Sequence, residues 1–261
     1  MKIWIIDAFT DRPFTGNPAA VCVLDEQKGD SWMQSVAAEM NLSETAFVQP
    51  LGQGFELRWF SPVLEVELCG HASLAAAQTL WPEKIVNDAQ PIQFHTKSGV
   101  LTCTQNGYLI ELDLPVTPAE ATDPPVRLLD VLRINPSYIG KAKFNRYLIL
   151  ESEQVVRSMQ PDFVKLRQVA MRGFIVTSFS SDDPRFDFVS CYFATGAGVD
   201  EDPVTGSAHC CLGPFWSERL GKTEMTAFQA SARGGTVHVR VQSDRAILAG
   251  QAVTVMKGEL V

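Results

Sequence analysis

The feature that most constrains the fold is a pattern that occurs twice along the chain. In the first half, the strand-like segment LRWF leads through a loop to LCGHAS and an alanine-rich, helix-forming run. In the second half, SCYF leads through a loop to VTGSAH and another helix-forming run, about 130 residues further on. A repeat of this length is typical of a duplicated structural unit. We therefore expect two pseudosymmetric lobes, whose two glycine-led helices begin opposite each other across a cleft.

The signals around this repeat predict an α+β fold in which each lobe wraps a sheet or barrel around a central helix. Short apolar segments with period-two alternation indicate strands, and apolar spacing of three and four residues indicates helices. The helices expected from this spacing cover 30–40 with Asp30 or Ser31 as cap, 71–81, a short run at 161–169, and a run beginning at Ser207.

The proline-rich stretch 115–126 contains few bulky apolar residues and is the best candidate for a linker. We place the N-terminal lobe at 1–116 and the C-terminal lobe at 117–261. This division leaves open that the last strand crosses back to the N-terminal lobe.

The charge of the chain limits its partners. A net charge of -8 and a pI near 5.0 argue against a nucleic-acid or anionic-membrane surface, although a local pocket of amides can still bind a small acidic substrate. No segment resembles a signal peptide or reaches transmembrane length. The cysteines have neither CxxC nor metal-ligand spacing, so we expect reduced thiols in a cytoplasmic protein and no bound metal. These cysteines are Cys22, Cys69, Cys103, Cys191, Cys210 and Cys211.

The starts of the two repeated helices are candidate substrate-binding positions. Gly70 and Gly206 let the backbone approach a ligand closely, and the first amides of a helix attract a negative group. Ser207, beside Gly206, and Ser73, one turn into the first helix, complete this predicted binding set. The alternative is that both segments are ordinary capped helices.

Three side chains near these positions are candidate acid/base groups. Glu44 lies where a helix gives way to a strand, and partial desolvation there would suit a carboxylate to proton exchange. Asp202 adjoins Glu201 in the second loop, where we expect only one of the two to face the substrate. His71 follows Gly70 directly, and the positive helix start favours a neutral imidazole. The structural alternatives are a surface glutamate for Glu44, an acid that caps or stabilises the start of a helix for Asp202, and a capping histidine for His71.

Nucleophilic and nucleotide chemistry have less support. Ser207 lies in TGSAH, which lacks the second glycine and the strand–elbow–helix context of a hydrolase. No glycine-rich phosphate-binding motif is present, so no nucleotide cofactor is expected. Cys69 at a helix start could serve as a thiol base, but a two-thiol racemase needs a partner, and Cys210 lies inside the second helix.

Five motifs in register resemble the PhzF-like isomerases of phenazine biosynthesis. They are DAFTDRPFTGNPAAVCVLD, NLSETAFV, RWFSP with LCGHASLAAA, GVDEDPVTGSAHC and QASARGG, and they extend from about residue 6 to the C-terminus. The resemblance implies the diaminopimelate epimerase-like fold, with the active site between two lobes. It also implies an enzyme that moves a proton between carbons without a metal or cofactor. In the characterised reaction of the family, the substrate is trans-2,3-dihydro-3-hydroxyanthranilate.

Matching the motifs position by position implies roles for individual residues. The family's acid/base glutamate corresponds to Glu44, with His71 and Asp202 orienting the substrate. The remaining matched positions are Gly70, Gly206 and Ser207. This chain departs from the family where Cys191 and Thr195 stand in place of the usual arginine and proline, which bears on the substrate rather than the fold.

The sequence therefore predicts a cofactor-independent isomerase that moves a proton on a small carboxylate or amino-acid-like substrate, and that forms a homodimer. Two alternatives stay open. One is a non-catalytic protein that binds small anions with the same residues. The other is a thiol-dependent racemase or epimerase that uses Cys69.

Overall fold

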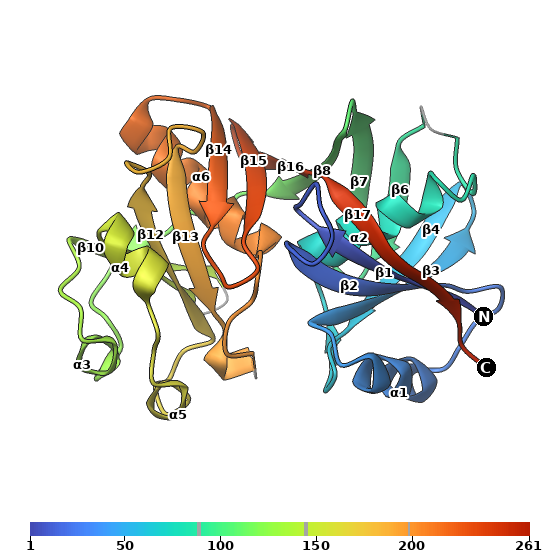
Figure 1. The fold of residues 1–261 in the computed structure, drawn as a ribbon, viewed down its shortest axis with the longest axis horizontal. Coiled ribbons are helices and arrows are strands. Elements are labelled where there is room, and N and C mark those ends of the chain that lie inside the picture. The colour runs from blue at the N-terminus through green and yellow to red at the C-terminus, as the bar shows by residue number, and fades with distance from the viewer. Residues whose placement is uncertain (88–89, 144–145, 198) are drawn as a thin grey trace. The chain divides into compact units, whose positions relative to one another are not determined.

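The computed structural model describes residues 1–87, 90–143, 146–197 and 199–261. The chain divides into two compact units, which are described one at a time (Figure 1). Unit 1 comprises Met1–Leu114 together with Ile247–Val261, and unit 2 comprises Pro115–Ala246. No helix in the described part of the chain is both long and apolar enough to cross a membrane.

Unit 1 is a mixed sheet with one buried helix. Its elements are β1 (Lys2–Ala8), β2 (Asn17–Val23), α1 (Asp30–Met40), β3 (Glu44–Leu51), β4 (Gly54–Phe60), β5 (Glu65–Val66), α2 (Gly70–Leu80), β6 (Ile92–Thr96), β7 (Gly99–Asn106), β8 (Leu109–Pro115) and β17 (Ala252–Glu259). β17, β1, β2, β3, β4, β6, β7 and β8 pair in that order. Among these pairs of the described residues, β2–β3 and β4–β6 are parallel and the others are antiparallel, and each parallel pair is connected through a helix.

The helix α2 forms the centre of unit 1, where it packs against β1, β2, β3 and β17. Every residue of α2 except Gln78 is buried. A helix that is buried on all sides needs small or apolar side chains throughout, and the alanines of HASLAAA supply them. The sequence therefore places α2 in the core, with its first residues at one end of the sheet.

The helix α1 covers a different part of the unit 1 sheet. Met33, Val36 and Ala37 face a cluster that includes Phe47 and Phe60, whose rings meet edge to face. The prediction that Asp30 or Ser31 caps this helix is wrong, because the N-cap is Gly29. Asp30 is instead the first helical residue, where its carboxylate accepts a hydrogen bond from Arg58.

Unit 2 repeats this topology with a second set of elements. They are β9 (Glu120–Ala121), α3 (Leu128–Leu132), β10 (Tyr138–Ala142), β11 (Arg146–Leu150), α4 (Glu153–Ser158), α5 (Phe163–Leu166), β12 (Gly173–Phe179), β13 (Phe188–Phe193), η2 (Thr195–Ala197), α6 (Gly206–Leu220), β14 (Glu224–Gln229) and β15 (Gly235–Gln242). The strand β16 (Arg245–Gly250) carries the chain from unit 2 back to unit 1.

The pairing of β10 to β15 matches that of β1 to β7, apart from the short β5. Antiparallel pairs β10–β11, β12–β13 and β14–β15 alternate with parallel pairs β11–β12 and β13–β14. As in unit 1, helices connect the parallel strands. The duplication inferred from LRWF and SCYF is therefore present in the strand topology, and the predicted α+β class with a central helix in each lobe is confirmed.

The central helix of unit 2 is α6, which packs against β14 and β15. Close approach to β15 requires glycine at position 213, because a Cβ atom there would lie 2.9 Å from Val239 Cγ1. The helix begins at Gly206, one residue before the predicted start at Ser207. Pro214 lies within α6 and has no N–H, and the carbonyl of Cys210, four residues earlier, accepts a hydrogen bond from the Thr117 amide.

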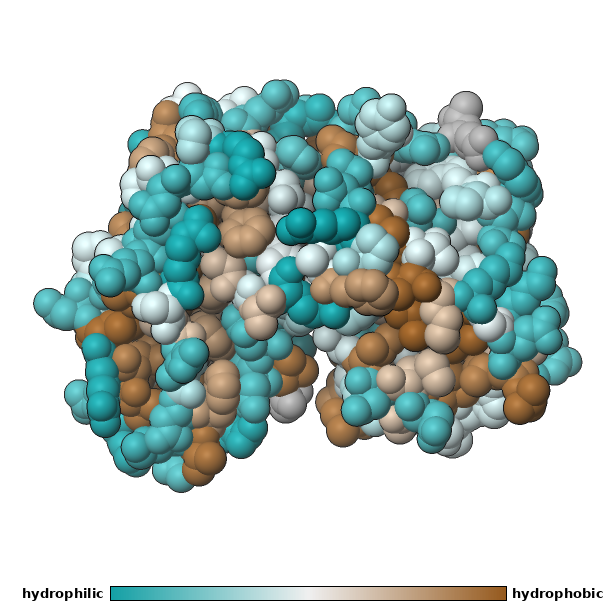
Figure 2. Space-filling view, in the orientation of Figure 1, coloured by the Kyte–Doolittle hydropathy of each residue, from teal (hydrophilic) through white to brown (hydrophobic). Residues whose placement is uncertain are grey.

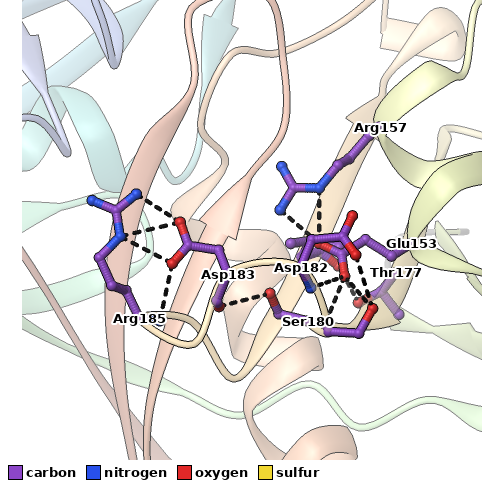
Figure 3. Close-up of polar contacts among 9 residues, drawn as sticks. Glu153, Arg157, Thr177, Ser180, Asp182, Asp183 and Arg185 are labelled. Atoms are coloured by element: carbon purple, nitrogen blue, oxygen red, sulfur yellow. Dashed lines mark hydrogen bonds and ion pairs between the residues drawn. The ribbon is translucent and has the colours of Figure 1, made fainter.

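One buried carboxylate fixes the loop after β12 to the helix α4 (Figure 3). Glu153 is only 6% exposed, and its Oε2 accepts hydrogen bonds from the Ser181 amide at 2.5 Å and the Asp182 amide at 3.1 Å. Its Oε1 accepts a hydrogen bond from Arg157 Nε at 2.8 Å. Burial alone would raise the pKa of Glu153, but these donors, Ser181 foremost, lower the pKa to about 2.

Candidate functional site

In unit 1 the fold brings together two side chains that the sequence singled out. Glu44 is the first residue of β3, and His71 is the second residue of α2. His71 Nε2 lies 3.3 Å from Glu44 Oε2. His71 is 3% exposed, and burial lowers its pKa to about 3. The imidazole is therefore neutral at physiological pH, which is the predicted state, but the cause is burial and not the helix start on which the prediction rests.

The second nitrogen of His71 indicates which tautomer is present. The buried Asn17 Nδ2 donates a hydrogen bond to His71 Nδ1 at 3.1 Å, and Cys69 Sγ lies 3.5 Å from the same atom. Because Nδ1 acts as an acceptor, the proton of the neutral ring is assigned to Nε2. The N–H of His71 is then on the side of Glu44.

Glu44, Cys69 and His71 also form a group whose ligand atoms lie within 4.8 Å of one another, which is close enough to test for a metal site. However, Glu44 approaches Nε2 of the imidazole, whereas Cys69 approaches Nδ1. A metal bound to one ring nitrogen lies about 2 Å from it and in the ring plane, so one ion would not reach both other ligands in this arrangement. The three residues therefore do not fit a preformed metal centre.

The start of α2 has no side-chain cap. Its N-cap is Cys69, which makes no capping hydrogen bond, and Gly70 is the first helical residue. Ser73 is completely buried, and its hydroxyl donates to the Cys69 carbonyl at 2.6 Å. The structure thus places Gly70 beside the Glu44–His71 pair, and it directs the hydroxyl of Ser73 into the helix.

In unit 2 the other predicted residues gather at the start of α6. Thr205 is the N-cap, Gly206 and Ser207 follow, and Asp202 lies three residues before the cap. The Thr205 hydroxyl does not cap the helix. It donates instead to Asp202 Oδ2 at 2.6 Å. The predicted acid and the predicted glycine–serine pair therefore lie around one helix start that has no side-chain cap.

An arginine that sequence reasoning missed lies beside Ser207. Arg146, the first residue of β11, donates through a terminal guanidinium nitrogen to Ser207 Oγ at 3.0 Å. Its guanidinium group also lies over the ring of Tyr192, 5.4 Å from the centroid. The unit 2 site thus contains a positive charge, whereas Cys191 is buried and bonded to the carbonyls of Val156 and Ala230.

Glu201 differs from its neighbour Asp202. It is partly buried, and that burial, followed by the charge of Asp202, raises its pKa. The Asp202 carboxylate is oriented by the Thr205 hydroxyl. The prediction that only one of the two adjacent acids faces the substrate remains a prediction.

The thiols other than Cys69 are poor candidates for chemistry. Burial raises the pKa of each to about 12, so they are protonated at neutral pH. They are Cys22, Cys103, Cys191, Cys210 and Cys211, and all are unpaired. Cys210, the thiol that follows the second glycine motif, points its sulfur toward the Gly206 carbonyl at 3.9 Å.

Sequence reasoning also missed Asn17, Thr205 and Gln229 as residues that hold the predicted groups. Asn17 is 54 residues from His71, and Gln229 is 27 residues from Asp202. Both lie in motifs that carry the family resemblance, Asn17 in the first of the five and Gln229 in the last. The signal available in the sequence was a polar residue at the end of a strand within a family motif. No spacing rule, however, connects Asn17 to His71 or Gln229 to Asp202.

A cavity of about 620 Å³ in unit 2 lies elsewhere, between α3, α4 and α5. Its lining includes Leu132, Ile134 and Met159, with Arg127 and Arg133 at the ends of α3. Figure 2 shows apolar and polar residues mixed on this side of unit 2. None of the predicted site residues lines this cavity.

The repeated topology, with its two central helices, defines an α+β protein with the diaminopimelate epimerase-like fold. A probable proline racemase from Agrobacterium radiobacter K84 shares the fold with a TM-score of 0.70 over 100% of this chain and 92% of that one, at 10% identity. A PhzF family protein from Enterococcus faecalis is more similar, with a TM-score of 0.93 and 36% identity over 100% and 98% of the two chains.

The family follows from the sequence comparisons. The model of the phenazine biosynthesis-like proteins, PhzC-PhzF, matches residues 6–258. An uncharacterized isomerase of Halalkalibacterium halodurans is 51% identical over 259 residues, covering 99% of this chain and 97% of the relative. This chain belongs to the PhzF-like family, as its five motifs predict.

Proposed function

We propose that this protein is an isomerase that moves a proton on a small carboxylate or amino-acid-like substrate. Glu44 takes the proton from one carbon and returns it to another. His71 orients the substrate as a neutral hydrogen-bond donor, and no bound cofactor takes part. In unit 2, Asp202 orients the substrate, while Gly206 and Ser207 bind its carboxylate.

The observation that carries this proposal is the contact between Glu44 and a neutral His71. A carboxylate beside an imidazolium would be held in a salt bridge and would be a weak base. With the His71 pKa at about 3, the carboxylate has an uncharged partner, and its basicity is kept for the substrate. General acid/base catalysis by one positioned group typically contributes 10²–10⁴-fold in rate.

The roles in unit 2 are supported by the start of α6. The helix start has no side-chain cap, so its amides point to whatever lies ahead of them. Arg146 adds a positive charge beside Ser207. Both features favour a negatively charged group of the substrate at this position, with Gly70 as a similar backbone position in unit 1.

The assembly and location of the protein are also part of the proposal. Cys22, Cys103, Cys191, Cys210 and Cys211 form no disulfide, which favours a reducing compartment such as the cytoplasm. We expect a homodimer. Because the chain is acidic overall, we expect it to bind neither nucleic acid nor membranes. Sedimentation velocity of the purified protein measures the oligomeric state directly.

The function is tested by proton NMR in deuterated buffer with candidate substrates, trans-2,3-dihydro-3-hydroxyanthranilate first and small amino acids after it. Wild type should place deuterium at carbon, and Glu44→Gln should lower that rate by roughly 10²–10⁴-fold. Glu39→Gln is the matched control, because Glu39 is an exposed residue of α1. A Glu44→Gln variant that exchanges at the wild-type rate contradicts the assignment. A candidate that binds without exchange in wild type favours the non-catalytic binding protein.

The thiol-dependent alternative is kept because Cys69 Sγ lies 3.5 Å from His71 Nδ1. It predicts that Cys69→Ser abolishes deuterium incorporation as completely as Glu44→Gln does. A two-thiol mechanism would need a second base, and the pKa of Cys210, at about 12, makes that thiol a poor one. We therefore expect Cys69→Ser to keep most of the exchange activity.

A further inference from the structure

A buried amide in unit 2 holds the loop that carries Asp202. Gln229 is the last residue of β14 and is completely buried. Its Nε2 donates to the backbone carbonyl of Asp202 at 2.6 Å, and its Oε1 accepts a hydrogen bond from the Thr205 amide at 2.8 Å. One side-chain amide therefore binds the main chain at both ends of the segment 202–205.

Thr205 continues this contact to the carboxylate itself. Its hydroxyl donates to Asp202 Oδ2 at 2.6 Å and lies 3.3 Å from Gln229 Nε2. A threonine at an N-cap ordinarily turns its hydroxyl to the amides of the first helical turn. Here the hydroxyl is turned away from the helix. It makes no capping hydrogen bond and instead binds and orients the Asp202 carboxylate.

The backbone at Thr205 is fixed from the other side by a second buried group. His209, one turn further along α6, is completely buried, and its Nδ1 lies 2.9 Å from the Thr205 carbonyl oxygen. A carbonyl can only accept, so Nδ1 carries the proton of this neutral imidazole. The amide, the carbonyl and the hydroxyl of Thr205 are thus all engaged, and its side chain has little freedom to reorient.

We propose that Gln229 is a positioning residue of the reaction, which holds the Asp202 carboxylate in its working orientation through Thr205. The inference rests on the proposed function, because it concerns the Asp202 of that site. A loop carboxylate is mobile by default, and a displacement of about 1 Å at a reacting centre can cost about 10²-fold in rate. Gln229 and Thr205 remove that freedom before the substrate binds.

The activity test compares Gln229→Leu and Thr205→Val with Thr205→Ser, which keeps the hydroxyl. In the deuterium-incorporation assay, kcat should fall about 10²-fold in Gln229→Leu and about 10-fold in Thr205→Val. Thr205→Ser should recover most of the loss. In an Asp202→Asn background, the Gln229 and Thr205 substitutions should lower kcat no further, because they act through Asp202.

A matched control separates positioning from general loss of structure. Thr177 is also completely buried in unit 2, where its hydroxyl donates to the Val189 carbonyl and accepts from Trp216 Nε1. Thr177→Val removes a comparable buried contact but touches none of the site residues, so kcat should stay within about 2-fold of wild type. The proposal is overturned if Gln229→Leu lowers kcat no more than Thr177→Val.

The glutamate substitution at position 229 adds a pH readout. A protonated carboxyl can still donate to the Asp202 carbonyl, whereas an ionised one cannot. The kcat of Gln229→Glu, relative to wild type at each pH, should therefore fall as pH rises through the pKa of the new side chain. A constant ratio across pH would contradict a donating role for Gln229.

A measurement without substrate distinguishes failure of this inference from failure of the proposed function. Hydrogen exchange of the Thr205 amide, followed by NMR, should speed up by at least about 10-fold in Gln229→Leu, because its acceptor is lost. The Asp202 amide, which donates to the Tyr192 carbonyl, serves as the internal reference. If the Thr205 amide exchanges unchanged, the positioning contact is absent, whatever the activity. If it speeds up but wild type moves no proton, the proposed function fails instead.

Discussion

Glu153 and Asp183 both have a pKa of about 2, yet only Glu153 contributes substantially to folding. Asp183 owes its low pKa to the Arg185 side chain and amide, and Arg185 is exposed, so water and salt screen the pair. Glu153 is buried among amide donors of the loop after β12 (Figure 3). A buried carboxylate without these donors would be costly, so the loop and α4 depend on each other.

We predict that Glu153→Gln lowers the free energy of unfolding by about 3 kcal/mol at pH 7, the value of a fall in pKa from 4.5 to about 2. Because the folded-state pKa is depressed, this stability is complete above pH 4.5 and is lost as pH falls toward 2. Urea unfolding at pH 7 and pH 3 measures it. The difference between wild type and Glu153→Gln should shrink at pH 3, and Asp183→Asn should have little effect at either pH. Equal differences at both pH values would contradict the assignment.

At the scale of single residues, the sequence predicts the candidate site residues but not the residues that hydrogen-bond to them and hold them in place. Local context in the sequence identifies both Glu44 and His71, and the structure places His71 Nε2 3.3 Å from Glu44 Oε2. Asn17 could not be paired with His71 from the sequence, because only the packing of β2 against α2 brings them together. The same holds for Gln229, which reaches Asp202 only after β13 and β14 pair in parallel. Positioning contacts depend on tertiary geometry, which no residue spacing encodes.

Among the elements, long periodic segments were predictable, whereas of the short helices named here only α5 was, inside the predicted run 161–169. The amphipathic α1 has the predicted bounds 30–40, and the alanine-rich α2 begins and ends one residue before the predicted 71–81. The short helices α3 and α4, with five and six residues, were not predicted, because they have too few turns for an apolar stripe. The α1 cap was wrong because Gly29 precedes two residues that are individually better capping types.

The proline in α6 illustrates how an irregular element serves packing. Pro214 has no N–H, so the carbonyl four residues earlier lacks its usual helical partner. That carbonyl, of Cys210, instead accepts a hydrogen bond at 2.9 Å from the amide of Thr117, near the start of unit 2. The proline therefore leaves this carbonyl available to the first residues of unit 2, which bind the side of the central helix.

We predict that Pro214→Ala weakens this docking, because the new N–H competes for the Cys210 carbonyl. Hydrogen exchange of the Thr117 amide should become about 3- to 10-fold faster, as expected for the loss of about 1 kcal/mol of local protection. The Val116 amide, which donates to the Asp244 carbonyl, provides a reference in the same segment. An unchanged Thr117 rate would mean that both donors share the carbonyl without competition.

For the whole molecule, duplication is the property that the sequence predicts best. Two copies of one strand–helix–strand pattern produce the same alternation of antiparallel and parallel pairs in each unit. Each central helix also contains a buried histidine, but at a different position: His71 directly follows the first residue of α2, whereas His209 is the fourth residue of α6. Their Nδ1 atoms also have different partners, the Asn17 side chain for His71 and the Thr205 carbonyl for His209.

These two histidines make the molecule sensitive to mild acid. Burial lowers the pKa of His71 to about 3 and of His209 to about 4, while unfolded histidine titrates near 6.5. Above pH 6.5 neither state binds the proton, and the stability is complete. As pH falls below 6.5, only the unfolded state is protonated, so each histidine lowers stability by about 1.4 kcal/mol per pH unit until its folded-state pKa is reached.

We predict that wild type loses stability between pH 7 and pH 5, above the range where most carboxylates titrate. His209→Asn keeps a donor near Nδ1 but cannot titrate, so it should lose about 2 kcal/mol less than wild type over this interval. His238, whose pKa is lowered by burial, adds to the acid sensitivity, and Glu201, whose pKa is raised, opposes it. Neither is removed by the substitution, so the difference between the two proteins isolates His209. Urea unfolding at the two pH values measures that difference, and parallel losses in both proteins would show that His209 is protonated in the folded state.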